Sequence, residues 1–326
     1  MINDLVAANR LHWDKSFTMG KREVLFFKYA GKEGYSFGWL IVLLVAFGLL
    51  IGASTGVALP KPEITYSSDS ISQGDVGFLR IQTTDGESPH VQWMNQELFM
   101  APYKNGKTWF GFFGADLKLK PGSYPMVVKT ASAGFRKQID VTVLSKGYGV
   151  RRLTLPKEMV DLDARTLERV KREAVIMKEV LEAPPTAPQW KGPFVKPLSG
   201  EVVGTFGQAS IINGMPRAPH SGVDLKAERG TPVAAINNGR VVLTGEHFFN
   251  GLFAVVDHGG AIQSLYFHLD KILVQQGDKV TKGQAVGLVG ATGRATGPHL
   301  HFGIRINGAR INPVQFMQLN EAMERL

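Results

Sequence analysis

The stretch between Glu33 and Lys61 carries no charged residue, and this feature constrains the topology of the whole chain. Within it an apolar run of 21 residues begins at Trp39, and a helix needs about 20 such residues to cross a bilayer. The segment before the run carries six basic and four acidic residues, and basic residues beside an apolar run favour a cytoplasmic N-terminus. We therefore predict a cytoplasmic segment over 1–37, a transmembrane anchor over 38–59, and export of 61–326.

A cleaved signal peptide is the alternative for the same stretch. The strongest apolar run, Trp39 to Ile51, is only 13 residues long, and Gly56-Val57-Ala58 is similar to a small-residue cleavage site. The leading segment is long for a signal peptide, which favours the uncleaved anchor. Both alternatives place the rest of the chain in the periplasm or outside the cell.

Composition narrows the chemistry that the exported part can use. A chain of 326 residues has room for two ordinary domains. It contains no cysteine, so any metal must be held by His, Asp or Glu. The net charge of +9 favours anionic partners such as acidic wall polymers or lipid headgroups. No dense run of Lys and Arg is interleaved with aromatic residues, and we therefore predict no nucleic-acid partner.

Residues 60–146 have the pattern of a small antiparallel β-sandwich. Short alternating runs are separated by turn signals such as Asp85-Gly86 and Pro121-Gly122. The segment shows no catalytic constellation, because its histidine, His90, stands alone. We expect a spacer, a partner-binding module or a shield over the next domain. The predicted strands cover 78–82, 91–94, 109–113, 124–128 and 135–143.

Residues 147–194 form a connecting segment with one amphipathic helix, predicted over 164–182. Apolar residues recur there at spacings of three or four, Asp163 can cap the start, and Pro184-Pro185 ends the helix. Its apolar stripe is expected to pack on a neighbouring domain, although it can also pair with a protein partner. A Pro-rich linker follows, with a domain boundary near Trp190.

Residues 195–317 are predicted to form a mainly β domain, and its histidines fall into groups. His299 and His301 are two apart on a predicted strand, so both point to one face, about 7 Å apart along the chain. His220 and Asp224 are four apart in a bent loop, and His268 follows an apolar run. A catalytic zinc takes three protein ligands and keeps one open position. These five residues supply three ligands and leave two histidines for acid–base chemistry, and spacing does not separate the roles of His299 and His301.

Three separated motifs in this domain carry a resemblance to a known family. The chain resembles the lysostaphin/LytM-type zinc endopeptidases, cell-wall enzymes that cut peptide bonds in peptidoglycan. The resemblance covers about residues 195–316 and is supported by Phe206-Gly207 and by Thr292-Gly293. The motifs, in order, are His220 with Asp224, then Leu265-Tyr266-Phe267-His268-Leu269, then Gly297-Pro298-His299-Leu300-His301-Phe302.

The resemblance implies a role for each site residue. It makes His220, Asp224 and His301 the ligands of Zn²⁺, and His268 and His299 the catalytic pair. His299 would accept the proton of the attacking water and His268 would bond to the oxyanion, with the two roles open to exchange. The implied function is hydrolysis of peptidoglycan cross-links outside the cytoplasmic membrane.

Two alternatives remain beside the enzyme. Scaffolds on the same fold bind the wall or activate another hydrolase, but such relatives lose metal ligands, and here all five positions are filled. Gly277-Asp278-Lys279-Val280 also resembles part of a biotinyl or lipoyl carrier domain, which needs none of the His and Asp set. The segment 208–217 is predicted to be a loop, with Asn213 as the candidate for orienting substrate. His12, His247 and His258 are expected to have no direct role.

The predicted fold class is therefore mainly β. It combines an N-terminal transmembrane helix, a small β-sandwich, a connecting amphipathic helix and a C-terminal antiparallel β peptidase domain.

Overall fold

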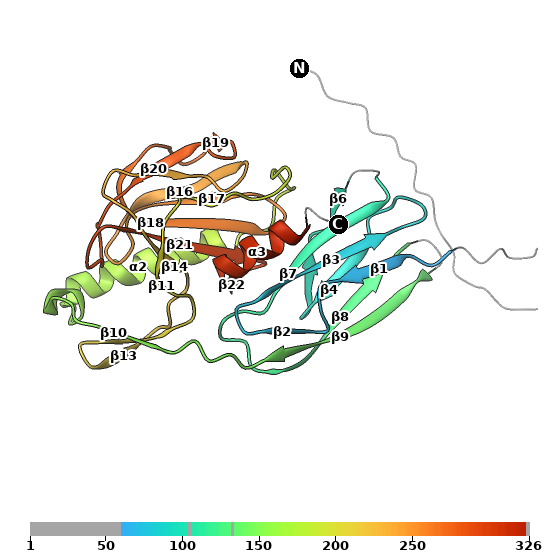
Figure 1. The fold of residues 1–326 in the computed structure, drawn as a ribbon, viewed down its shortest axis with the longest axis horizontal. Coiled ribbons are helices and arrows are strands. Elements are labelled where there is room, and N and C mark those ends of the chain that lie inside the picture. Colours follow the sequence, from blue (N-terminus) through green and yellow to red (C-terminus); the bar gives the residue numbers. More distant parts are fainter. Residues whose placement is uncertain (1–59, 104–105, 132–133, 324–326) are drawn as a thin grey trace, which may run out of the picture. The chain divides into compact units, whose positions relative to one another are not determined.

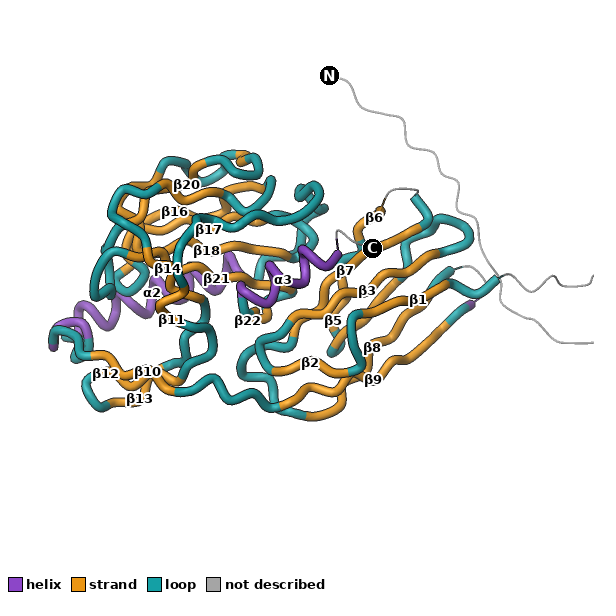
Figure 2. Tube along the Cα trace, viewed as in Figure 1, coloured by secondary structure: helices purple, strands orange, loops and turns teal. Residues whose placement is uncertain are grey.

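The computed structural model describes residues 60–103, 106–131 and 134–323. Strands far outnumber helices in this part, and Figure 2 shows helix confined to short stretches of the trace. The predicted mainly β class is thus confirmed. The predicted cytoplasmic and transmembrane segments, 1–37 and 38–59, lie outside the described residues. Among the residues that are described, no helix combines the length and hydropathy required to cross a bilayer.

The first half of the described chain forms two sheets that pack face to face (Figure 1). One sheet has the order β1-β3-β7-β6 and the other β2-β9-β8-β4-β5. Trp93 and Phe113 lie fully buried between them. The strands are β1 (Glu63–Tyr66), β2 (Ser70–Ser72), β3 (Val76–Gln82), β4 (His90–Trp93), β5 (Gln96–Leu98), β6 (Ala101–Tyr103), β7 (Thr108–Gly114), β8 (Gly122–Lys129) and β9 (Arg136–Leu144).

This sandwich matches the five predicted strands and adds β1, β2, β5 and β6. One pairing is not antiparallel, because β2 runs parallel to β9. The two strands are distant in sequence and no tight hairpin joins them, so the connection does not enforce an antiparallel arrangement. The predicted domain bounds themselves stay a prediction.

A ten-stranded sheet forms the second half of the described chain. Its main path has the order β11-β14-β21-β18-β17-β16-β19, and β15, β20 and β22 pair beside that path. All of its strand pairs are antiparallel. The strands are β11 (Val202–Gly204), β14 (Val223–Lys226), β15 (Pro232–Ala234), β16 (Gly239–His247), β17 (Gly251–Asp257), β18 (Ile262–Ile272), β19 (Lys279–Val280), β20 (Ala285–Val289), β21 (His299–Ile306) and β22 (Ala309–Ile311).

A separate three-stranded sheet corrects two predictions. β12 (Ala209–Ile212) and β13 (Met215–Arg217) form a hairpin where a loop was predicted. β10 (Val150–Leu153), placed in the connecting segment by sequence, pairs parallel with β12. The hairpin turns at Asn213 and Gly214, both of which have positive φ, a backbone region in which Asn and Gly are favoured. The connecting segment therefore contributes a strand to the second half of the molecule.

The connecting helix packs on the ten-stranded sheet. α2 (Ala164–Leu181) follows the 3₁₀ turn η2 (Lys157–Met159), and the Asp163 side chain accepts a hydrogen bond from Thr166 N at 2.7 Å, as a helix cap does. Its half-buried Met177 and Leu181 pack against the apolar cluster of β16, β17 and β18. The prediction of a helix packed on a neighbouring domain is confirmed, while pairing with a protein partner stays a prediction.

The two halves of the described chain share one apolar core. α3 (Pro313–Met323), which sequence did not predict, places Phe316 against Phe112 of the sandwich with ring centroids 5.7 Å apart. Gln315 bonds to both backbone polar groups of Val76, at 2.9 and 3.0 Å, and Arg310 forms an ion pair with Asp116. The sandwich is therefore docked on the sheet that carries the histidines.

Candidate active site

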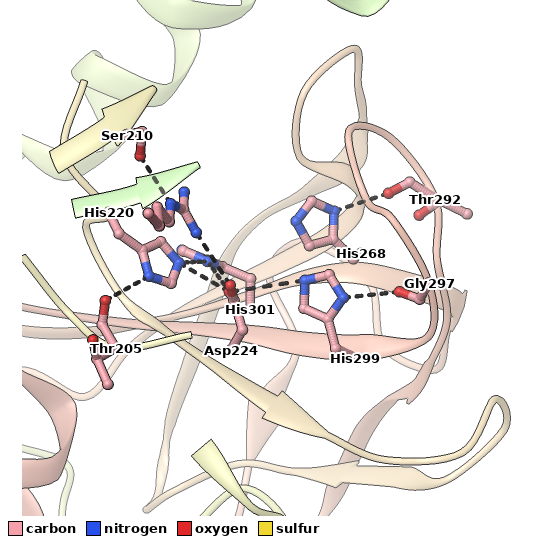
Figure 3. A network of polar contacts seen from close by, with 10 residues as sticks. Thr205, Ser210, His220, Asp224, His268, Thr292, Gly297, His299 and His301 are labelled. Atoms are coloured by element: carbon pink, nitrogen blue, oxygen red, sulfur yellow. Dashed lines mark hydrogen bonds and ion pairs between the residues drawn. The ribbon is translucent and has the colours of Figure 1, made fainter. Parts of the chain in front are cut away.

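Sheet register brings the predicted residues together. β14 pairs with β21 so that Asp224 lies directly opposite His301, and residues in that relation point to the same face of the sheet. His220 lies three residues before β14 begins at Val223. β18, the other neighbour of β21, places Phe267 opposite His301, and His268 follows directly. All five residues predicted from sequence therefore lie in one region of the sheet (Figure 3).

Three of them converge on a single point. The Nε2 atom of His220, the Nδ1 atom of His301 and the Oδ1 atom of Asp224 are each 2.9 Å from the other two. In Figure 3 these side chains point toward one another, and they form the one group in the described residues that could hold a metal ion. The Nδ1 atom of His220 lies 2.9 Å from the carbonyl oxygen of Thr205. That carbonyl requires a donor, so the proton of neutral His220 sits on Nδ1 and Nε2 presents a lone pair.

This donor set fits zinc. Three lone-pair atoms this close repel one another unless a cation or a proton lies between them. Two imidazole nitrogens and one carboxylate oxygen leave a fourth position open, as in catalytic zinc sites. The contact between His220 and the Thr205 carbonyl fixes one ring in the orientation that a metal ligand needs.

Electrostatics favours the ligating protonation states. Burial opposes ionisation of Asp224, but its close polar contacts with the imidazoles of His220 and His301 outweigh burial and lower the pKa of the carboxyl. Burial lowers the pKa of His301. An anionic carboxylate and neutral imidazoles are the forms that bind metal, so the residues need little rearrangement of charge to accept an ion.

The remaining two histidines lie side by side next to the three ligands. The rings of His268 and His299 have centroids 4.9 Å apart, and His299 Nε2 lies 3.8 Å from Asp224 Oδ1. Each ring donates through Nδ1 to a carbonyl: His268 to Thr292 and His299 to Gly297, both at 2.8 Å. In the neutral form of each ring, Nε2 is therefore left as the acceptor. Burial, aided by the charges of His301 and His299, lowers the pKa of His268 to about 3.

A β-bulge aims His268 at the site. Between β17 and β18, Leu252 pairs with Leu269 but Ala254 pairs with Tyr266, so β18 carries one extra residue over this interval. His268 has φ of 62°, a left-handed conformation that is uncommon for residues other than glycine. Bulges change the direction of a side chain beside a site. The backbone of β18 is therefore strained at the residue predicted to act in catalysis.

The five residues open into a cavity of about 250 Å³. β10 supplies one side of it through Arg151, whose Nη1 atom lies 3.3 Å from Asp224 Oδ2 and whose Nε donates to Ser210 Oγ at 2.8 Å. Arg294, on the loop before β21, also lines the cavity. The sequence did not point to either arginine. Arg151 was missed because the short apolar alternation at residues 150–153 does not reveal that this strand pairs in parallel with a segment 59 residues further along the chain.

A known crystal structure shares this architecture over most of the chain. A crystal structure assigned to peptidase M23 from Pseudomonas aeruginosa covers 80% of this chain and 96% of its own, with 30% sequence identity and a TM-score of 0.55. The chain belongs to peptidase family M23. The model of peptidase family M23 matches residues 218–313, which include all five site residues. The resemblance seen in the sequence and the assignment as a metallopeptidase are both confirmed.

Curated relatives of this M23 peptidase match over the same region. Peptidoglycan DD-endopeptidase ShyA of Vibrio cholerae is 45% identical over 98 residues, which are 30% of this chain and 23% of the relative. DD-carboxypeptidase/endopeptidase Mpg of Neisseria meningitidis is 42% identical over 95 residues, 29% of this chain and 22% of the relative. The chain thus spans less than a quarter of the length of these curated relatives. The match gives no support to the carrier-domain alternative.

Asn213 does not have the role expected for it in this M23 peptidase. Its side chain accepts a hydrogen bond from Leu155 N and donates one to Leu155 O, each at 2.9 Å. Both amide atoms are thus committed to fixing the backbone beyond β10 against the β12–β13 hairpin. The prediction that Asn213 orients substrate is wrong, because a turn residue with φ of 49° clamps neighbouring backbone instead.

The other histidines of the described chain lie away from the ligands. His258 is completely buried between Asn238 O and Ser264 Oγ, both at 2.8 Å. His247 packs on Phe253 with ring centroids 4.4 Å apart, and His90 is exposed on the sandwich. None of these three histidines lines the cavity that holds the five site residues, and their lack of a direct role stays a prediction. His12 lies outside the described residues.

Proposed function

We propose that this M23 peptidase is a zinc-dependent endopeptidase that hydrolyses peptide cross-links of bacterial peptidoglycan outside the cytoplasmic membrane. The observation that carries the proposal is the convergence of His220, Asp224 and His301 beside the free Nε2 atoms of His268 and His299. A binding scaffold needs neither the ligands nor the second pair of histidines. Relatives named peptidoglycan DD-endopeptidases support the choice of substrate.

The histidine pair supplies the proton transfers. Zinc, when bound, supplies a Lewis acid that polarises a peptide carbonyl and acidifies water. His299 and His268 each present an unprotonated Nε2 to the cavity, so either can accept the proton of the attacking water. The ring that takes the proton becomes a donor at Nε2, and it can then stabilise the oxyanion or deliver the proton to the leaving amine. Because both rings have the same tautomer, hydrogen bonding does not separate their roles.

Location and partners complete the proposal. Peptidoglycan lies outside the cytoplasmic membrane, and the apolar run over 38–59 supports a single-pass anchor with a cytoplasmic N-terminus. A protein partner that binds the β-sandwich or the helix over 164–182 is a further part of the prediction. Where the structure describes these two elements, neither lines the cavity.

The experiment compares zinc content and wall digestion in matched variants. Purified wild-type protein should hold about one zinc ion per chain and release peptide fragments from purified peptidoglycan, identified by mass spectrometry. His301→Ala should lose most of the bound zinc and the fragments, because it removes a ligand. His299→Ala should keep zinc and lose activity by about 10²–10⁴-fold, the usual contribution of a general base.

His90→Ala is the control, because His90 is an exposed imidazole far from the metal ligands in the sheet order. It should behave as wild type in both measurements. Wild-type protein that binds wall, holds no zinc and releases no fragment would establish the scaffold instead of the enzyme.

A further inference from the structure

Arg294 lies in the catalytic cavity and has no role in the chemistry described above. We propose that its guanidinium binds a free carboxylate of the peptide substrate, next to the bond that is cut. The proposal rests on the proposed function and specifies the substrate class for the same site.

The loop before β21 holds Arg294 in a fixed position. Its backbone N–H donates to the carbonyl of Phe249 at 2.9 Å, and its guanidinium carbon lies 4.1 Å from the centre of the Phe249 ring. Gly293 packs so closely on Gly251 that an added Cβ would lie 2.2 Å from its backbone nitrogen. Stacking uses the flat face of the guanidinium and leaves its in-plane N–H donors available.

The guanidinium has no anionic partner within the described chain. No hydrogen bond or ion pair of this group occurs among the described residues, although Arg294 is partly buried. The acid that lines the cavity, Asp224, is already engaged by Arg151, His220 and His301. A partly desolvated cation without a counter-charge is unfavourable, and binding of an anion removes that cost.

Neighbouring charges strengthen the attraction for an anion. Burial lowers the pKa of Arg294, and the positive charges of Arg151 and Arg217 lower it further. The positive potential from Arg151 and Arg217, which disfavours the charged form of Arg294, favours binding of a negatively charged ligand. Arg217 donates to the Val160 carbonyl at 3.4 Å, which holds it at the edge of the β12–β13 hairpin.

A carboxylate is the anion that a peptide substrate can offer. Arginine binds carboxylates through two parallel hydrogen bonds, which give both energy and orientation. Arg294 shares its cavity with His268 and His299, so the bound carboxylate must belong to a residue close to the scissile bond. An amidated peptide of the same shape would leave the guanidinium unpaired.

The test uses one pair of substrates and the zinc-loaded enzyme. The first is a cross-linked peptide dimer with a free carboxylate on the residue that supplies the amine of the scissile bond. The second is the same dimer with that carboxylate converted to an amide. We expect wild type to favour the free carboxylate by at least about tenfold in kcat/KM, the effect of one charged hydrogen bond. Arg294→Gln should abolish this preference, so that its kcat/KM is the same for the two dimers.

Two further variants separate charge from structure. Arg294→Lys keeps the charge without the planar fork and should retain part of the preference. Arg240→Gln removes an exposed arginine of β16 and should retain all of it. Equal kcat/KM of wild type for the two dimers would overturn the carboxylate subsite and leave the proposed function intact.

If neither dimer is cut, the proposed function is contradicted. A binding measurement still tests the carboxylate subsite in that case. Calorimetry with the amine-side product peptide, free or amidated, should show tighter binding of the free carboxylate to wild type. Arg294→Gln should bind both forms equally. Equal binding of the two forms by wild type would overturn the subsite.

Discussion

His258 provides a quantitative test of how burial controls stability in this fold. Its ring is completely buried, with Nδ1–H donating to the Asn238 carbonyl and Nε2 within hydrogen-bond distance of the Ser264 hydroxyl oxygen, both at 2.8 Å. Ser264 also bonds to Tyr266 Oη at 2.8 Å. Burial lowers the pKa of His258 from 6.5 to about 4. The folded protein therefore holds this imidazole neutral under conditions in which the unfolded chain binds a proton.

The sign and size of the effect follow from this difference in pKa. Because the folded value lies below the unfolded one, the stability is fully present above pH 6.5 and is lost as the pH falls toward 4. One pKa unit corresponds to about 1.4 kcal/mol. The free energy of unfolding should therefore fall by about 2 kcal/mol at pH 5 and by about 3 kcal/mol at pH 4 from this group alone.

Urea unfolding of wild type and His258→Gln between pH 7 and pH 4 measures this loss of the free energy of unfolding. A chelator removes zinc from both proteins beforehand. The site histidines are the same in both proteins, so the difference between the two curves isolates His258. The variant should start less stable at pH 7 and lose about 2 kcal/mol less on going to pH 5.

Parallel curves for the two proteins would refute the reasoning. The exposed control His90→Gln should follow wild type throughout. If His258→Gln does not fold, NMR titration of wild type measures the pKa of His258 directly. An ordinary pKa near 6.5 would also refute the reasoning.

Two substitutions test the supports of the site. In Gly222→Ala the new Cβ would lie 2.4 Å from the Phe302 carbonyl oxygen and 2.8 Å from His301 Nε2, so zinc affinity measured by chelator competition should fall about 10- to 100-fold. The control Gly147→Ala, where nothing lies within 4 Å of the added Cβ, should leave zinc affinity unchanged. Unaltered zinc affinity in Gly222→Ala would contradict the geometry. Asn213→Gly keeps a backbone that tolerates positive φ but removes both hydrogen bonds to Leu155, so thermal unfolding should show a loss of about 1–3 kcal/mol. No loss would show that the clamp contributes nothing.

Much of the site could be predicted because its residues stand in short local motifs. Alternation placed His299 and His301 on one face of a strand, and the exclusion of cysteine left His and carboxylate as the available ligands. The family resemblance then separated ligand from base, which spacing alone could not do. The structure places Asp224 opposite His301 in the sheet, so the residues assigned as ligands do meet.

The failures have a common physical cause. Arg151 and Asn213 act through pairing between β10 and β12, whose strands are short and far apart in sequence. Local pattern contains no information about which distant backbone will supply a partner. The turn signal at Asn213-Gly214 was visible, but whether the amide side chain faces substrate or neighbouring backbone depends on what packs beside the turn.

The sequence by itself determined the mainly β class, the amphipathic helix, the five site residues and the metal chemistry open to them. Each of these follows from local residue type and spacing. Tertiary structure decided the rest. It set the bulge that turns His268 into the cavity, the strand that brings Arg151 to Asp224, and the stacking of Arg294 on Phe249, which leaves the guanidinium without an anionic partner among the described residues. These features depend on register and packing between segments distant in the chain, where one residue of slip reverses the face to which a side chain points.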